Sequence, residues 1–330
     1  MSEQPGQAPE CAPVTVSVVI PTRNRRELLL RAVRSVLRQS QVTLSVVVVD
    51  EASTDGSAEA VRRLGDPRVH VVRHASPRGV SQARNTGLQQ VESPWVAFLD
   101  DDDLWAPDKL SAQLEALRAQ PQAQWACTGA VNIDPRLRIL NVMDPPPDPD
   151  ISDLLLTMNA VPGGGSGVLV ATALARQVGG FDTALSNLAD WDFYIRLCLR
   201  SPVAAVPAPL VGYLVHAAGM AHDIERSSRE IGYLDVKYDD ERRARGVCLD
   251  RGAWLQYLAR LAYNRGDRWT SLHLALRSVR HGQLRALRSV TGAFLPDRVR
   301  IVTQRRALGE VPPDVLQQAS AWLAPYADGS

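Results

Sequence analysis

Residues 96–105 read VAFLDDDDLW, an apolar run that leads directly into four consecutive aspartates at positions 100–103. Adjacent carboxylates repel one another, and aspartate favours neither strands nor helices. One explanation is a helix start, where carboxylates are favourable, although two acids are sufficient for that purpose. A calcium site is a second, but the EF-hand spacing with its central Gly and terminal Glu is absent. The third, which we favour, is a divalent cation bound by carboxylates together with substrate phosphates.

The residues around this stretch predict an α/β fold. Short apolar runs rich in β-branched residues occur at 14–20, 44–49, 68–72 and 95–99, and segments with helical spacing lie between them. This alternation is typical of βαβ units and a parallel sheet. Ligands of such sheets bind beyond the carboxyl ends of the strands. We therefore expect residues 21–24, Asp50, Glu51 and the four aspartates to meet at one sheet edge.

The composition is that of an ordinary globular protein. The chain has 330 residues, 45% of them hydrophobic and 22% charged. The four cysteines lie far apart without a C-x-x-C pair, which argues against a zinc module or a disulfide framework and predicts a cytoplasmic setting. No stretch approaches the roughly 18 apolar residues of a membrane span. Residues 1–13 have no apolar h-region, so we expect a disordered leader and not a signal peptide.

Several motifs follow one another along the chain: VSVVIPTRNRRELLLRAVRSVL, VVVDEASTDGS, GVSQARNTGL, VAFLDDDDLWAPDKL, GVLVATALARQVGGFDTAL and ADWDFYIRL. In this order and spacing, over roughly residues 15–220, they resemble the family-2 inverting glycosyltransferases. The resemblance implies a GT-A type fold at residues 14–235, with a mostly parallel sheet flanked by helices. It also implies a nucleotide-diphosphate sugar as donor, a Mn²⁺ or Mg²⁺ ion, and transfer of the sugar with inversion to an acceptor nucleophile such as a hydroxyl.

The resemblance assigns roles to individual residues. The donor-binding residues would be Pro21, Thr22, Arg23, Asp50, Arg84, Asp100 and Asp101. Asp50 would contact the base of the nucleotide, and Arg84 would lie near the base or the phosphates. Asp102 would be nearest the metal, with His216 close to the metal and the diphosphate. Asp190 would be the catalytic base.

Three departures from the family pattern bear on these roles. The four consecutive acids leave the position of the metal ligand open by one residue. Ala189 stands where the family commonly has Glu before the catalytic Asp, and Glu51-Ala52 replaces the usual residues after Asp50. Each assignment also has a simpler alternative. Asp190 could cap its helix while Asp192 acts as the base, His216 could be an ordinary partly buried histidine, and Arg84 could form a surface ion pair. The PGGGSG segment at 162–167 either lines the acceptor site or is a turn.

The arginines are concentrated near the C-terminus. Residues 242–306 hold fifteen arginines and three acids, although the whole chain carries a net charge of only +1. We expect a basic helical extension at residues 236–330, including a helical hairpin around residues 264–267. Its arginines are either solvated or paired within the fold, or they form a peripheral membrane patch at the inner face of the membrane. Nucleic acid is a weaker candidate, because no recognition motif accompanies the arginines.

Together these observations predict a metal-dependent inverting glycosyltransferase whose acceptor is a glycan, a lipid-linked sugar, a peptide or a small molecule. A nucleotidyltransferase is the alternative enzyme, although the PTRNRR loop lacks the glycines such enzymes usually place after the first strand. A non-catalytic nucleotide-binding protein with a GT-A-like fold is the alternative from another class, since the Glu before Asp190 is missing.

Overall fold

A single sheet forms the centre of the protein. The computed structural model describes residues 15–216, 223–281 and 312–327, so the leader predicted at 1–13 lies outside the described residues. Four parallel strands lie in the order β3-β2-β1-β4: β1 (Thr15–Thr22), β2 (Thr43–Asp50), β3 (Val69–Arg73) and β4 (Trp95–Phe98). The sheet continues beyond β4 through β8 (Val168–Ala171), β6 (Trp125–Ile133), β9 (Val203–Leu214) and β5 (Leu104–Trp105), with β7 (Ile139–Met143) on β6.

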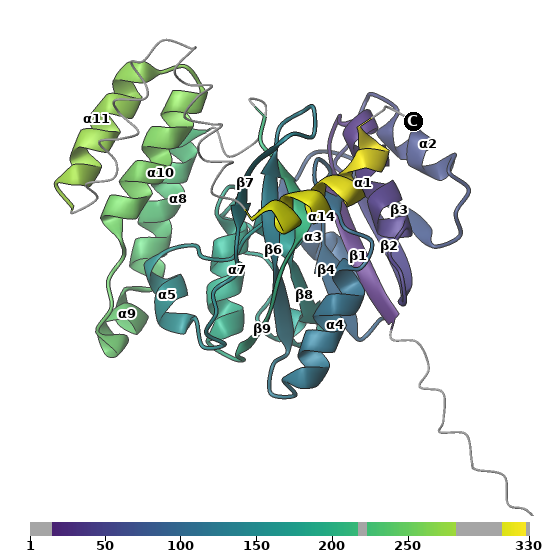
Figure 1. The fold of residues 1–330 in the computed structure, drawn as a ribbon, viewed down its shortest axis with the longest axis horizontal. Coiled ribbons are helices and arrows are strands. Elements are labelled where there is room, and N and C mark those ends of the chain that lie inside the picture. Colours follow the sequence, from purple (N-terminus) through teal and green to yellow (C-terminus); the bar gives the residue numbers. More distant parts are fainter. Residues whose placement is uncertain (1–14, 217–222, 282–311, 328–330) are drawn as a thin grey trace, which may run out of the picture.

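Helices cover both faces of this sheet (Figure 1). Successive side chains of a strand point to opposite faces. Val16, Val18 and Ile20 of β1 pack with residues of α1 (Arg26–Leu37) and α4 (Lys109–Ala119). Val19 packs on the other side with α3 (Val80–Gln89), α6 (Thr172–Gln177) and α7 (Ala189–Cys198). The short helices α2 (Ser57–Arg62) and α5 (Ser152–Thr157) complete this part of the fold.

The predicted α/β class and the convergence of strand ends are confirmed. Strand β1 extends past the apolar run expected at 14–20, because Pro21 pairs with Val49 and Thr22 with Asp50 in register. Both residues therefore belong to the strand and lie directly at the carboxyl edge of the sheet.

The described residues of the C-terminal part are mostly helical. It comprises α8 (Ile224–Lys237), α9 (Asp239–Arg245), α10 (Arg251–Asn264), α11 (Arg268–Val279), α14 (Pro313–Leu323) and the short turn η3 (Ala324–Tyr326). Helices α10 and α11 form the predicted hairpin, and Asp250 and Asp267 cap them by accepting the amides of Ala253 and Thr270. Within the described ranges, no helix has the length and apolarity required to cross a membrane.

Helix α14 packs away from this hairpin, against β9 of the main sheet (Figure 1). Trp322 and Leu323 join an apolar cluster with residues of β6 and β9. The approach is close at Gly212, where a Cβ atom would lie 3.1 Å from the indole of Trp322. A larger residue at this position would therefore push the helix off the strand.

Candidate active site

The four aspartates alternate between buried and accessible positions. Asp101 and Asp103 are buried, whereas the side chains of Asp100 and Asp102 retain 23% and 14% of their exposure. The accessible pair is Asp100, one of the predicted donor-binding residues, and Asp102, the residue predicted to be nearest the metal. The buried and the accessible positions face different neighbours, so the four aspartates make different contacts.

Asp103 is a buried carboxyl that links separate segments of the site through hydrogen bonds. Its carboxylate accepts hydrogen bonds from the Ser166 hydroxyl at 2.6 Å and from the Leu214 amide at 2.9 Å. It thereby joins the acidic stretch to the end of β9 and to η1 (Gly164–Gly167), a 3₁₀ turn. Burial and the neighbouring acids raise the pKa of Asp103 well above its usual value. The cost of burying this carboxyl beside other acids is partly offset by the two hydrogen bonds that it accepts.

Asp101 faces the end of the first strand. It accepts a hydrogen bond from the Thr22 hydroxyl at 2.7 Å, and Arg25 Nη1 lies 3.1 Å from its other oxygen. Burial, followed by the charge of Asp102, raises the pKa of Asp101 to about 7. Arg25 was not among the predicted site residues, and the sequence offered only its position after the strand as a signal.

Asp102 and His216 come together as a pair suited to a metal ion. Asp102 Oδ2 lies 3.0 Å from His216 Nε2. Adjacent ligands of an octahedral ion with bonds of about 2.1 Å are about 3 Å apart, so the two donors fit one Mg²⁺ or Mn²⁺. Arg25 Nη1 lies 2.6 Å from the same Asp102 oxygen and supplies positive charge there. Three or more His, Cys, Asp or Glu side chains do not gather as a metal site anywhere in the described residues, so phosphate and water would complete the shell.

Arg84 connects the acidic stretch to the predicted base. Its side chain is buried, its Nη2 donates to Asp100 Oδ1 at 2.5 Å, and its guanidinium lies 5.0 Å from the centre of the Phe181 ring. The alternative of a surface ion pair is therefore wrong. Arg84 reaches this position across Gly165, where a Cβ atom would lie 2.6 Å from Nη2. The cation also interacts with Asp190 and opposes the rise in its pKa.

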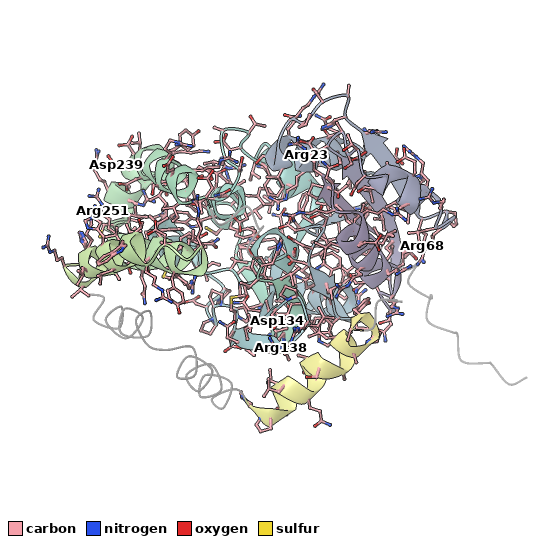
Figure 2. The ribbon with its side chains drawn as sticks, turned by 90° about the horizontal axis from the view of Figure 1, so that it is seen from above. Arg23, Arg68, Asp134, Arg138, Asp239 and Arg251 are labelled. Atoms are coloured by element: carbon pink, nitrogen blue, oxygen red, sulfur yellow. The ribbon has the colours of Figure 1, made fainter. Side chains whose placement is uncertain are left out.

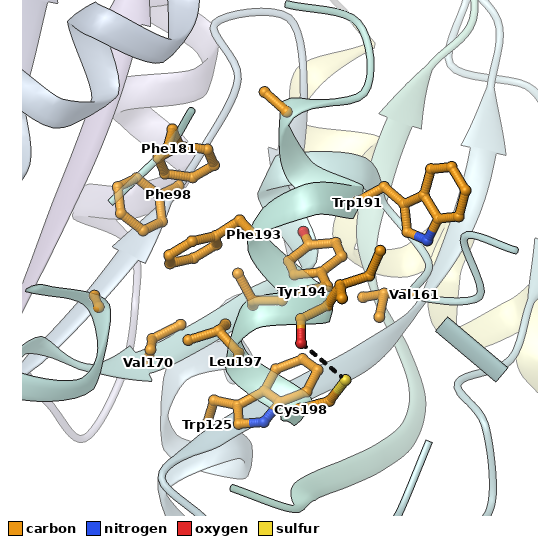
Figure 3. Packing of buried hydrophobic residues seen from close by; sticks show 14 of the residues in the cluster. Phe98, Trp125, Val161, Val170, Phe181, Trp191, Phe193, Tyr194, Leu197 and Cys198 are labelled. Carbon is orange, nitrogen blue, oxygen red and sulfur yellow. Dashed lines mark hydrogen bonds between the residues drawn. The ribbon is translucent and has the colours of Figure 1, made fainter. Parts of the chain in front are cut away.

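Asp190 occupies the first turn of α7 and is half-buried. Burial raises its pKa to about 6, and the positive charge of Arg84 limits the rise. Aromatic packing of Phe193 with Phe98 and Phe181 fixes the helix against the sheet (Figure 3). A partly accessible carboxyl with a pKa near neutrality is a suitable general base.

The loop before α7 is held by a carboxylate from another helix. Glu230 of α8 accepts the amides of Ser186 at 3.0 Å and Leu188 at 2.8 Å. Ala189, which stands where the family commonly has Glu, is fully buried. The loop that leads to Asp190 is thus stabilised by α8. This contact joins segments far apart in the chain, so local sequence patterns could not reveal it.

Asp192, the alternative base, has a structural role. It is fully buried, and one of its oxygens pairs with Arg196 at 2.6 Å. The other lies 2.7 Å from both Lys237 Nζ and the Tyr238 hydroxyl. Both oxygens are therefore engaged, and the pairs fasten α8 to α7.

The nucleotide side of the site lies at the ends of β1 and β2. Asp50 is fully buried; one oxygen accepts the Ser53 amide at 2.9 Å, and the other lies 3.2 Å from Arg73 Nε without a hydrogen-bond partner. Pro21 is buried beside it, whereas Arg23 is exposed at the surface (Figure 2). This oxygen therefore has the charge of Arg73 as its neighbour but accepts no hydrogen bond in this structure.

Glu51 has a structural role that accounts for its departure from the family pattern. It accepts the amides of Arg78 at 2.7 Å and Gly79 at 2.6 Å, and it contacts the His74 ring. These bonds fix the loop that leads into α3, the helix that carries Arg84.

The PGGGSG segment lies at the centre of the site. The Tyr194 hydroxyl donates to the Gly164 carbonyl at 2.5 Å, and a Cβ atom at Gly164 would lie 3.6 Å from Asp190 Oδ2 and 3.3 Å from the Tyr213 ring. Tyr257 of α10 is close enough to Asp190 to feel its charge. Burial, and then the charge of Asp190, raise the pKa of Tyr257 to about 12. Sequence reasoning missed Tyr213 and Tyr257, which carry no motif of their own, and it did not single out Ser166 within the PGGGSG segment.

The comparisons relate part of the chain to a known family of enzymes. Residues 17–156 match the family model described as Glycosyl transferase family 2, so this part of the chain belongs to the family-2 glycosyltransferases. TuaG of Bacillus subtilis (strain 168), named for teichuronic acid biosynthesis, is 41% identical over 102 residues, which make up 30% of this chain and 40% of that protein. WfgD of Escherichia coli, named as a UDP-Glc:alpha-D-GlcNAc-diphosphoundecaprenol beta-1,3-glucosyltransferase, is 30% identical over 102 residues, or 31% of this chain and 40% of that protein. The chain thus spans less than half the length of these two relatives.

The fold is shared with solved glycosyltransferase structures. Mannosyltransferase PcManGT from Pyrobaculum calidifontis, solved in complex with GDP-Man and Mn²⁺, superposes with a TM-score of 0.54 at 20% sequence identity. The superposition covers 97% of this chain and 90% of that chain. This likeness confirms the predicted GT-A fold.

Proposed function

We propose that the protein is a metal-dependent inverting glycosyltransferase that uses a nucleotide-diphosphate sugar as donor. One observation carries the proposal. Arg84 spans the space between Asp100, which adjoins the Asp102–His216 pair, and Asp190, whose pKa of about 6 suits a base. A cation site for a diphosphate and a base for an acceptor are thus combined in one site.

The residues divide the reaction between them. Asp102 and His216 would hold the metal ion, which supplies positive charge to the departing diphosphate. Asp190 accepts the proton of the acceptor hydroxyl, and the acceptor oxygen forms a bond to the anomeric carbon. The bond from that carbon to the phosphate oxygen breaks on the opposite face, so the configuration inverts and a nucleoside diphosphate leaves. Arg84 and Arg25 add fixed positive charge near the developing anion, and such preorganised charge is commonly the largest catalytic effect.

We further propose that the acceptor is a saccharide carried by a membrane lipid diphosphate, and that the product enters a bacterial surface polysaccharide. The support is the name of WfgD, which specifies a diphosphoundecaprenol acceptor, and that of TuaG, which specifies teichuronic acid biosynthesis. A peripheral position at the inner face of the membrane follows from such an acceptor. A nucleotidyltransferase is less well supported, because Asp190 is a partly accessible carboxyl that suits the general base of a sugar transfer.

A nucleotide screen tests the donor site. Nucleoside diphosphates should raise the melting temperature in the presence of Mn²⁺, because a hundredfold excess over the dissociation constant stabilises the fold by about 2.7 kcal/mol. Asp102→Ala should abolish the Mn²⁺-dependent shift and the turnover of a panel of nucleotide-sugars. Asp108→Ala, an exposed acid six positions along the chain, is the matched control and should keep both. Unchanged turnover in Asp102→Ala would refute the metal assignment, and binding without turnover in the wild type would favour the non-catalytic alternative.

A further inference from the structure

The outer face of α11 is apolar where solvent would favour polar residues. Trp269 is 77% exposed and Leu276 is 49% exposed. They are separated by seven positions, about two helical turns, and therefore lie on the same face. The buried residues of this helix, including Leu274 and Ala275, occupy the opposite face and pack against α10. In Figure 1, α11 is the outermost helix on its side of the protein.

The arginines that surround this face have no acidic partners among the residues that the structure describes. Upstream arginines are used within the fold: Arg242 and Arg251 pair with Asp235, and Arg245 pairs with Glu241. Along α11 and the turn before it, the exposed arginines form no ion pair with any described residue; they are Arg265, Arg268, Arg277 and Arg280. Residues 251–281 contain six arginines and one acid. The hairpin is therefore a strongly basic surface with an exposed tryptophan and leucine at its centre.

We propose that this α11 face, defined by Trp269, Leu276, Arg277 and Arg280, docks on an anionic lipid bilayer. Basic residues near such a surface each contribute attraction, and tryptophan is suited to the boundary between headgroups and acyl chains. Two apolar anchors on a short helix give reversible attachment and not insertion. The proposal rests on the proposed function in one respect, namely that the acceptor is carried by a membrane lipid.

The same hairpin reaches the catalytic side of the protein. On its inner side, the indole of Trp254 lies 4.5 Å from that of Trp191, the residue that follows Asp190. Tyr257 of the same helix lies within the electrostatic influence of Asp190. A bilayer bound to the outer face of α11 would consequently be linked through two packed helices, α11 and α10, to the helix that carries Asp190. Arg23 lies away from Arg251 of the hairpin (Figure 2).

Flotation with vesicles tests this surface on the full chain. Vesicles of phosphatidylcholine mixed with phosphatidylglycerol should bind the protein, pure phosphatidylcholine should not, and binding should weaken as salt rises. Arg277→Gln with Arg280→Gln should lower the partition coefficient about 30-fold, the factor expected from two surface charges. Arg62→Gln with Arg63→Gln removes two exposed arginines from α2 and its end, and should leave binding unchanged. Trp269→Ala with Leu276→Ala should also reduce binding, whereas Leu154→Ala, another exposed apolar residue, should not.

Several results would overturn the proposal. Equal binding to neutral and anionic vesicles is one, and equal losses in the α11 and α2 variants are another. A concentration-dependent dimer that disappears in Trp269→Ala with Leu276→Ala, without vesicle binding, would identify the face as a contact between copies of the chain. Nucleotide-sugar turnover with a soluble acceptor should be unaffected by the α11 variants. If turnover is absent altogether but anionic vesicles still bind, the proposed function fails while the docking surface stands.

Discussion

Removal of the Arg84 charge should shift the pH at which the enzyme loses its base. Arg84 lowers the pKa of Asp190, which burial has raised to about 6. Loss of a nearby opposite charge raises a carboxyl pKa by about 1 to 3 units, so Arg84→Met should place Asp190 at about 7 or above. At a shift of about one unit, the ionised fraction falls from about nine-tenths to about half at pH 7, and from about half to about one-tenth at pH 6.

The assay is the pH dependence of kcat/KM with the donor selected by the nucleotide screen. The acid limb of the wild type should lie near pH 6 and move upward in Arg84→Met, because a raised pKa keeps the proton on the base to higher pH. Arg73→Met is the matched control: it removes the cation beside Asp50 at the same sheet edge, so it should weaken donor binding without moving the limb. An acid limb that stays in place in Arg84→Met, or moves equally in the control, would refute the link between Arg84 and Asp190.

Three further variants test the remaining assignments. Asp190→Asn should lower turnover by roughly 10² to 10⁴ with donor affinity retained, and a collapse of donor affinity in binding assays would place Asp190 on the donor side. Asp192→Asn should lower the free energy of unfolding in urea by about 3 kcal/mol, because it removes the charge of a buried carboxylate that pairs with Arg196 and Lys237, whereas Asp190→Asn should not destabilise the protein; equal stability of the two variants would contradict these roles. Gly165→Ala should displace Arg84 and move the acid limb upward, unlike Gly232→Ala on α8, where a Cβ meets nothing within 4 Å; an unmoved limb would show that Arg84 adapts.

The sheet and the position of the site were predictable because both depend on local patterns. Apolar runs that alternate with helical segments identify a parallel sheet. The carboxyl ends of parallel strands lie at the same edge of the sheet, so this edge could be located without knowing the rest of the fold. Asp50 and the aspartates at 100–103 therefore converge as expected. Their division of labour was not predictable, since it depends on Ser166, Leu214 and Thr22, which are distant in sequence.

The C-terminal helices show the same limit. The structure places Trp269 and Leu276 on the outer face of α11, where they are 77% and 49% exposed. A helical pattern reveals which residues share a face and not whether another element covers that face. Likewise, the contact of Glu230 with the loop before α7 joins segments far apart in the chain, so local reasoning saw only the missing acid at position 189.

The packing of α14 on β9 has a consequence for synthesis on the ribosome. The apolar side of β9 that receives Trp322 and Leu323 is made long before them, because β9 ends at Leu214. With translation at roughly 5 to 20 residues per second, about 5 to 20 s pass between the synthesis of β9 and that of Trp322 and Leu323. During that interval the apolar side of β9 stays exposed on the nascent chain. This strand is therefore the expected binding site for a chaperone.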